Sequence, residues 1–165
     1  MIIPHDMIIT QNNLSKELLI NILHSVFIET EMDRDGDIMI PDAAAPCFVV
    51  PYIAGNESRI RFAIYYAYGH DVSEQKRIET INDLNKTSSL LKATNTVKGR
   101  LSLSWDIPVA GGITKKAFIC ALAIFSRYAA DAIEKHLTGD VRLMTCKPIY
   151  PGAVEHSRKN APREM

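Results

Sequence analysis

The stretch "SRIRFAIYYAYG", residues 58–69, decides how this chain folds. Its side chains alternate in character, and a period of two is typical of a β-strand with one buried and one wetter face. The apolar row consists of Ile60, Phe62, Ile64 and Tyr66, and the opposite row of Arg59, Arg61, Ala63 and Tyr65. The alternation therefore predicts a long strand whose first row lies in the core.

A second pair of strands is predicted further along the chain. Residues 91–98 and 100–109 alternate as regularly, and Gly99 between them tolerates the positive φ of a tight hairpin. In the second of these strands the apolar row is Leu101, Leu103, Trp105, Ile107 and Val109, opposite Ser102, Ser104 and Asp106. Upstream, residues 37–41 and 46–53 are short, β-rich and bounded by prolines, which indicates strands near a sheet edge.

Three segments have helical spacing. Residues 14–27 form an amphipathic stripe, residues 71–90 begin with a capping box of Asp71 and Glu74, and residues 115–137 are the most hydrophobic segment. The seam of this last helix is Phe118, Leu122, Phe125, Ala129 and Ile133. The order α-β-β-β-α-β-β-α predicts an α+β fold of two layers, an antiparallel five-stranded sheet packed with helices.

Length and composition favour a single domain. The chain has 165 residues, of which 47% are hydrophobic, and we assign residues 1–139 to one α+β domain. Residues 140–165 mix prolines and charges without a sustained period, so we interpret them as an appended C-terminal segment, partly ordered or flexible. Lys plus Arg and Asp plus Glu both number 19, which favours neither a nucleic-acid nor a membrane partner. The N-terminus lacks the pattern of a signal peptide, and we expect a cytoplasmic protein.

The acidic stretch "ETEMDRDGDIMIPD", residues 29–42, looks like a calcium loop. An EF-hand needs glycine at loop position six and a closing glutamate at position twelve. Counted from Asp33, Gly36 comes too early, at position four, and position six, where glycine is required, is Ile38. The stretch therefore predicts a charged turn that leads into a strand.

Neither the cysteines nor the histidines indicate a cofactor or a metal. Cys47, Cys120 and Cys146 are far apart and form no C-x-x-C pair, so we expect reduced, buried thiols, with Cys120 inert inside the apolar third helix. The five histidines have no H-x-x-x-H spacing, and neither G-x-S-x-G nor a phosphate-binding glycine loop occurs. We therefore expect no cofactor, no metal and no catalytic residues.

The order of elements, with "INDLN" at residues 81–85 and "GGIT" at residues 111–114, resembles the YbjN family of bacterial sensory transduction regulators. The likeness covers roughly residues 14–137, with "DRDGDI" where the family has its turn into the first strand. The family's fold resembles that of type III secretion chaperones. The resemblance implies a bacterial, non-enzymatic protein that works by binding other proteins.

Two asparagines of the second helix and two glycines before the third form a candidate structural signature: Asn82, Asn85, Gly111 and Gly112. Asn82 and Asn85 share the apolar stripe of their helix, so we expect both amides to lie against the domain and to bond a neighbouring loop or strand. A ligand-binding role is the alternative. Trp105 is expected to be a core aromatic beneath the third helix, with a binding hot spot as the alternative.

The candidate protein-binding residues are Arg59, Arg61 and Tyr65, on the wetter row of the long strand. Arginine and tyrosine carry binding energy at interfaces, although a solvated sheet face also explains them. Three classes of function remain: a chaperone-like or regulatory protein-binding module, an immunity protein or antitoxin that blocks a toxin, and an enzyme of unrecognised type. The expected partner is another protein or a second copy of the chain.

Overall fold

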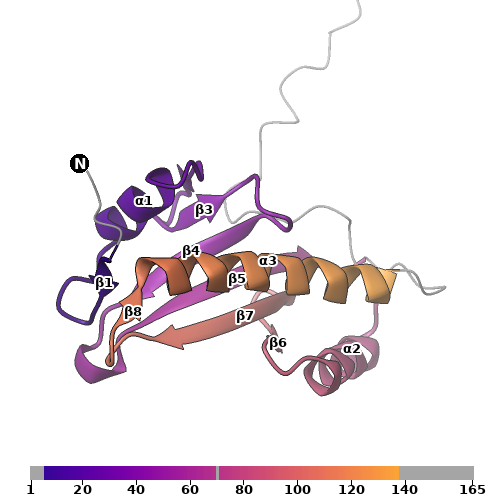
Figure 1. Ribbon diagram of the computed structural model, residues 1–165. Coiled ribbons are helices and arrows are strands. Elements are labelled where there is room, and N and C mark those ends of the chain that lie inside the picture. Colours follow the sequence, from indigo (N-terminus) through magenta and orange to yellow (C-terminus); the bar gives the residue numbers. More distant parts are fainter. Residues whose placement is uncertain (1–5, 70, 138–165) are drawn as a thin grey trace, which may run out of the picture.

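The computed structural model describes residues 6–69 and 71–137, which form an antiparallel sheet with helices packed on it (Figure 1). The strands of the main sheet are β2 (Glu31–Met32), β3 (Ile38–Ile40), β4 (Cys47–Tyr52), β5 (Arg59–Ala67), β6 (Lys92–Asn95) and β7 (Arg100–Pro108). Their order in the sheet is β2-β3-β4-β5-β7-β6, and every neighbouring pair is antiparallel. The α+β class is confirmed, but the predicted five strands are wrong, because β2 adds a sixth at the edge.

The additional strand comes from the acidic stretch, which is a β-hairpin. Between β2 and β3 the Asp33 N–H donates to the Asp37 carbonyl at 3.0 Å, and the Asp37 N–H donates to Asp33 Oδ1 at 2.7 Å. Gly36 has a φ of 75° and supplies the left-handed residue that this turn needs. The predicted charged turn into a strand is confirmed. Two-residue β2 is too short for its alternation to be read from the sequence.

Calcium or magnesium at millimolar concentration should leave the melting temperature of the protein unchanged. Asp33 already accepts a backbone hydrogen bond within the turn, and the Lys16 ammonium lies 3.7 Å from Asp37 Oδ1 and also donates to the Gly36 carbonyl. This lysine supplies the positive charge that a bound cation would bring. Thermal melts with and without each metal test the expectation, and a clear calcium-dependent rise in melting temperature would contradict it.

A second, two-stranded sheet joins the N-terminal residues to the start of the third helix. Strand β1 (Ile8–Ile9) pairs with β8 (Ile113–Thr114), neither of which the sequence predicts. The turn before β8 requires Gly112, whose φ is 79° and whose added Cβ would lie 2.8 Å from a methyl carbon of Ile8. The Thr114 hydroxyl then accepts from the Ala117 N–H at 3.1 Å and caps the helix, as its position predicts.

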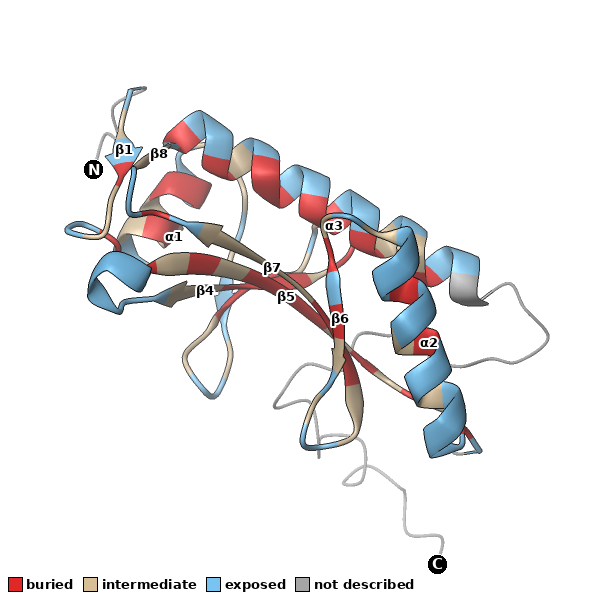
Figure 2. Ribbon diagram, turned by 90° about the horizontal axis from the view of Figure 1, so that it is seen from below, coloured by how far each residue is buried: buried red, intermediate tan, exposed pale blue. Residues whose placement is uncertain are grey.

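Two helices, α1 (Lys16–His24) and α3 (Lys115–Leu137), cover one face of the main sheet, and α2 (Glu74–Thr87) packs along β6 (Figure 1). Figure 2 shows the buried side of α3 turned toward the sheet and its exposed side turned away. The predicted seam of α3 is confirmed, since all five of its residues are buried. At the start of α2 the prediction is wrong, because Ser73 rather than Asp71 accepts the capping hydrogen bond, from Lys76 N at 3.2 Å.

The core confirms both apolar rows that the sequence predicts. Phe62 of β5 is fully buried, with its ring centroid 5.9 Å from that of Phe118 and 5.6 Å from that of Phe125 on α3. Trp105 of β7 meets Phe62 edge to face at 6.3 Å and is partly buried against the core, as predicted. These contacts hold α3 across the middle of the sheet.

Two cysteines lie among the described residues, and their environments differ. Cys47 is buried, and burial raises the pKa of its thiol to about 12, so it stays protonated and inert. Cys120 is exposed, so its predicted burial is wrong. The reason is its place on α3, which lies outside the arc that the seam residues occupy. Cys146 and the predicted C-terminal segment lie outside the described residues.

Within the two described ranges, none of the helices combines the length and the apolar character needed to cross a membrane.

Candidate functional site

The candidate binding residues lie on the face of the sheet that points away from α3. We call this site the polar patch, and it consists of Tyr52, Arg59, Arg61, Tyr65, Lys92, Thr94, Ser102, Ser104 and Asp106. The strand register brings them together, since β5 pairs with β7 although α2 and β6 separate the two strands in the sequence. Most of these side chains are half-buried, and next to them Phe48 and Ala63 are buried on the same face. This face is therefore less solvated than the sequence predicts.

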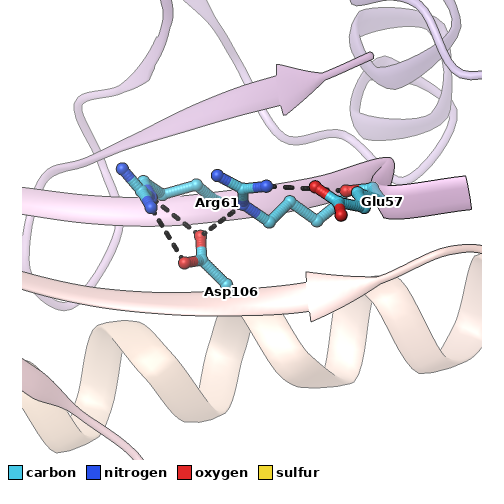
Figure 3. A network of polar contacts seen from close by, with 4 residues as sticks. Glu57, Arg61 and Asp106 are labelled. Atoms are coloured by element: carbon cyan, nitrogen blue, oxygen red, sulfur yellow. Dashed lines mark hydrogen bonds and ion pairs between the residues drawn. The ribbon is translucent and has the colours of Figure 1, made fainter. Parts of the chain in front are cut away.

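An ion pair occupies the centre of the polar patch. Arg61 lies directly opposite Asp106 and donates two parallel hydrogen bonds, Nε to Oδ1 at 2.7 Å and Nη2 to Oδ2 at 2.9 Å (Figure 3). The Arg59 Nε lies 3.7 Å from the same Oδ1. The planar guanidinium matches a carboxylate in this geometry, and the pair thereby holds both side chains in place.

The ion pair sets the charge of both partners. Its hydrogen bonds lower the pKa of Asp106 below its ordinary value of 3.8 and raise the pKa of Arg61. Within the polar patch, Arg59 also makes a cation–π contact with Tyr52, because its guanidinium carbon lies 4.3 Å from the ring centroid. The lowered pKa makes Asp106 a weaker proton acceptor than an unpaired aspartate.

Beside the ion pair the patch is slightly hollowed. Six of its residues, Arg61, Tyr65, Lys92, Thr94, Ser102 and Ser104, line a hollow of about 120 Å³. Pockets for small molecules typically measure about 300 to 1,000 Å³, so this hollow is smaller than a typical small-molecule site. The Tyr65 ring lies 5.7 Å from the ring of Phe48, and burial raises the pKa of its hydroxyl, which remains a neutral hydrogen-bonding group.

Replacing Asp106 by asparagine should reduce stability in a pH-dependent way. Because the pKa of Asp106 is lowered in the folded state, its contribution is present above the ordinary value of 3.8 and is lost as the pH falls through the lowered pKa. The side chains of the pair are 35% and 36% exposed, so we expect a loss of at most about 1 kcal/mol at neutral pH.

Urea denaturation of both proteins, from neutral pH to below about pH 3, measures this difference. The difference in free energy of unfolding between the wild type and Asp106→Asn should become smaller on acidification. A difference that stays constant over the whole range would show that the ion pair does not account for it.

The asparagines lie elsewhere, on α2. Asn85 Nδ2 donates to the Ala93 carbonyl at 3.0 Å, and the Ala93 N–H donates to Asn85 Oδ1 at 2.8 Å, so this amide bonds the backbone of the edge strand β6. Asn82 is exposed and has no hydrogen bond of this kind, and Asn85 is also mostly exposed. The expected bond to a neighbouring strand is therefore confirmed for Asn85, whereas the expected burial of both amides is wrong. The inner face of α2 presents Thr80 and Leu84 instead.

The two glycines also lie outside the polar patch, in the turn between β7 and β8. Gly112 has the positive φ described above, whereas an added Cβ at Gly111 would meet open space. The structure thus separates the predicted signature into two places, the β6 edge and this turn, and brings neither next to Arg59, Arg61 and Tyr65.

Sequence reasoning missed several members of the polar patch, above all Asp106, Tyr52 and Lys92. Asp106 lies in the polar row of its strand, and this position in the alternation could have indicated that it belongs to the same face. The sequence does not reveal that β5 and β7 are neighbours, and without that pairing Asp106 cannot be placed opposite Arg61. Among the described residues, no group of three or more acidic, histidine or cysteine side chains is placed to hold a metal ion.

The family model of YbjN, described as "Putative bacterial sensory transduction regulator", matches residues 15–136. A search of curated proteins finds no match to this sequence. Among solved structures, the crystal structure of YbjN from E. coli, described as "a putative transcription regulator", is similar with a TM-score of 0.63 and 15% sequence identity. The similarity covers 80% of this chain and 96% of that one, and at this identity it shows a common fold.

Proposed function

This chain belongs to the YbjN family, and we propose that it is a bacterial regulatory protein that binds another protein through the polar patch. The observation that carries the proposal is the fixed pair of Arg61 and Asp106, with Arg59 stacked on Tyr52 beside it. Arginine and tyrosine are enriched among residues that dominate binding energy at interfaces. Here they lie side by side on a rigid sheet.

The pair leaves hydrogen-bonding capacity for a partner. Arg61 uses two of its five N–H groups on Asp106, and Arg59 approaches the same carboxylate only at 3.7 Å. An acidic or amide side chain entering the hollow would meet Arg61, Lys92 and the hydroxyls of Ser102 and Ser104. The residues of the patch are thus suited to bind an acidic or amide side chain of a partner. Asp106, the carboxylate among them, is already hydrogen-bonded to Arg61.

Affinity capture from the native bacterium tests the proposal. The bait is tagged wild-type protein, compared with Arg59→Ala, Tyr65→Phe and the double variant Arg61→Ala/Asp106→Ala. These changes avoid leaving an unpaired charge in the sheet or a cavity beside Phe48. Arg34→Ala is the matched control, since Arg34 is an exposed arginine outside the patch, near the turn between β2 and β3.

We expect wild type and Arg34→Ala to retain the same partner, with its dissociation constant raised at least about tenfold by the patch variants. Melting temperatures measured in parallel show whether each variant is folded. If folded patch variants bind every recovered partner as tightly as the wild type, the binding surface lies elsewhere.

A further inference from the structure

A large apolar groove runs along α3 on the opposite side of the molecule from the polar patch. It measures about 740 Å³ and lies between α3 and the segments 27–29 and 42–44. Its apolar walls come mainly from Ile28, Ile40, Ile119, Leu122 and Ala123. A second hollow of about 170 Å³ adjoins it at Ile119 and extends it toward the start of α3.

The exposed side of α3 continues this apolar surface. Ile124 is 42% and Tyr128 50% exposed, and the small residue Cys120 is also exposed on this side of α3, while the small residue Ala123 lines the groove. This exposed side is visible in Figure 2 as the pale outer edge of the helix. Small side chains at such positions allow the backbone of another helix to approach closely.

Phe27, at the rim of the groove, adds a second independent sign that this surface is used. The residue is 96% exposed, and its φ of 62° is one that a bulky residue adopts only at an energetic disadvantage. The residue terminates α1 at a position where glycine is usual. Termination of the helix explains this backbone conformation but does not require an exposed aromatic side chain, and strain of this kind is often associated with binding sites.

We propose that this surface joins two copies of the chain, with their α3 helices packed antiparallel about a two-fold axis near Ala123 and Ile124. The charged residues of α3 favour a second copy of the chain as the partner and an antiparallel direction of its helix. Lys116 lies seven residues before Ala123, and Asp131 lies seven after Ile124, so each is about 10 Å from the axis along the helix. An antiparallel pair therefore places Lys116 of one copy beside Asp131 of the other, twice, by symmetry.

The other arrangements of two helices are less favourable. A parallel pair in the same register would bring Lys116 beside Lys116 and Asp131 beside Asp131, and like charges across an interface oppose association. Neither Lys116 nor Asp131 has an ion-pair partner among the described residues, so both are available. In the antiparallel pair Arg127 lies beside Cys120 of the second copy, whose small side chain leaves room for it.

The groove adds to the surface area that the proposed dimer interface can bury, because one face of a helix alone is too small. A stable interface typically buries about 800 Å² on each partner, which is more than a single helical stripe provides. With α3 of the second copy seated against the groove, Phe27 and the segment 42–44 join the contact. The proposal does not depend on the polar patch, which lies on the other face of the sheet.

Sedimentation velocity of the full chain over a range of concentrations tests the proposal. The wild type should sediment as a dimer, and Ile124→Glu should weaken dimerisation at least tenfold. Ile78→Glu is the matched control, because Ile78 is also an exposed isoleucine, 44% exposed, on α2. It should leave the dimer intact, and so should Arg59→Ala in the polar patch.

Charge exchange provides a test that does not depend on the apolar substitution. Lys116→Asp and Asp131→Lys should each weaken the dimer, and the variant that carries both should recover it. Both side chains are solvent-exposed, so each variant should fold. A wild type that stays monomeric, a dimer that Ile124→Glu leaves unchanged, or a double variant no better than the single ones would overturn the proposal.

Discussion

Replacing Phe62 by alanine should lower the free energy of unfolding by about 3–5 kcal/mol. Phe62 is fully buried in the middle of β5 and contacts aromatic rings on two other elements, Trp105 on β7 and Phe118 and Phe125 on α3. Truncation removes the apolar contacts of a whole ring and leaves a cavity that these rigid neighbours cannot close. Against a total stability of about 5–15 kcal/mol, the loss would leave the protein marginally folded.

Chemical denaturation measures the effect, and a fall in melting temperature of roughly 10 °C should accompany it. Phe62→Leu retains most of the volume and should lose clearly less. Val97→Ala is a control at a fully exposed position and should be nearly neutral. A loss of less than about 1 kcal/mol for Phe62→Ala would mean that α3 is not held by this contact.

Much of the fold was predictable because long elements carry many repeats of their pattern. The rows of β5 and β7 each run over nine residues, and the structure buries the predicted apolar row or packs it against the core. The helix α3 has 23 residues, and its seam from Phe118 to Ile133 is buried as predicted. In such segments one face is buried, so apolar residues recur with the period of the strand or helix. This period can be recognised in the sequence.

The short elements were missed for the opposite reason. Strands β1, β2 and β8 contain two residues each, and no period can be recognised over that length. Their positions depend on partners distant in the chain, such as the Lys115 N–H that donates to the Met7 carbonyl at 2.9 Å. The predicted sheet consequently lacked its sixth strand and the small sheet beside it.

The candidate site was predictable only in part. The row that holds Arg59, Arg61 and Tyr65 follows from alternation alone, and whether it binds a protein stays a prediction. The pairing of Arg61 with Asp106 depends on the strand order β5-β7-β6, which local sequence does not encode. The groove beside α3 was not predicted at all, because three segments distant in sequence form it.

Replacing Asn85 by leucine should destabilise the protein by about 1–3 kcal/mol and make it prone to aggregate. The Asn85 amide bonds both the N–H and the carbonyl of Ala93 on the outer edge of β6, as a neighbouring strand would. Ala93 is buried, so the loss of these bonds leaves two backbone groups poorly satisfied. The substitution also leaves part of the edge strand β6 unpaired, and unpaired edge strands tend to associate with other chains.

Asn82→Leu is the matched control for this prediction. It makes the same chemical change on the same helix, where leucine favours helix over asparagine by a few tenths of a kcal/mol, but it removes no hydrogen bond to β6. The difference between the two variants therefore isolates the contact with Ala93. Asn85→Asp should fall between them, because a carboxylate still accepts from the Ala93 N–H and cannot donate to its carbonyl. Denaturation curves and light scattering on heating measure both effects, and equal stabilities for Asn82→Leu and Asn85→Leu would show that the β6 edge does not need this amide.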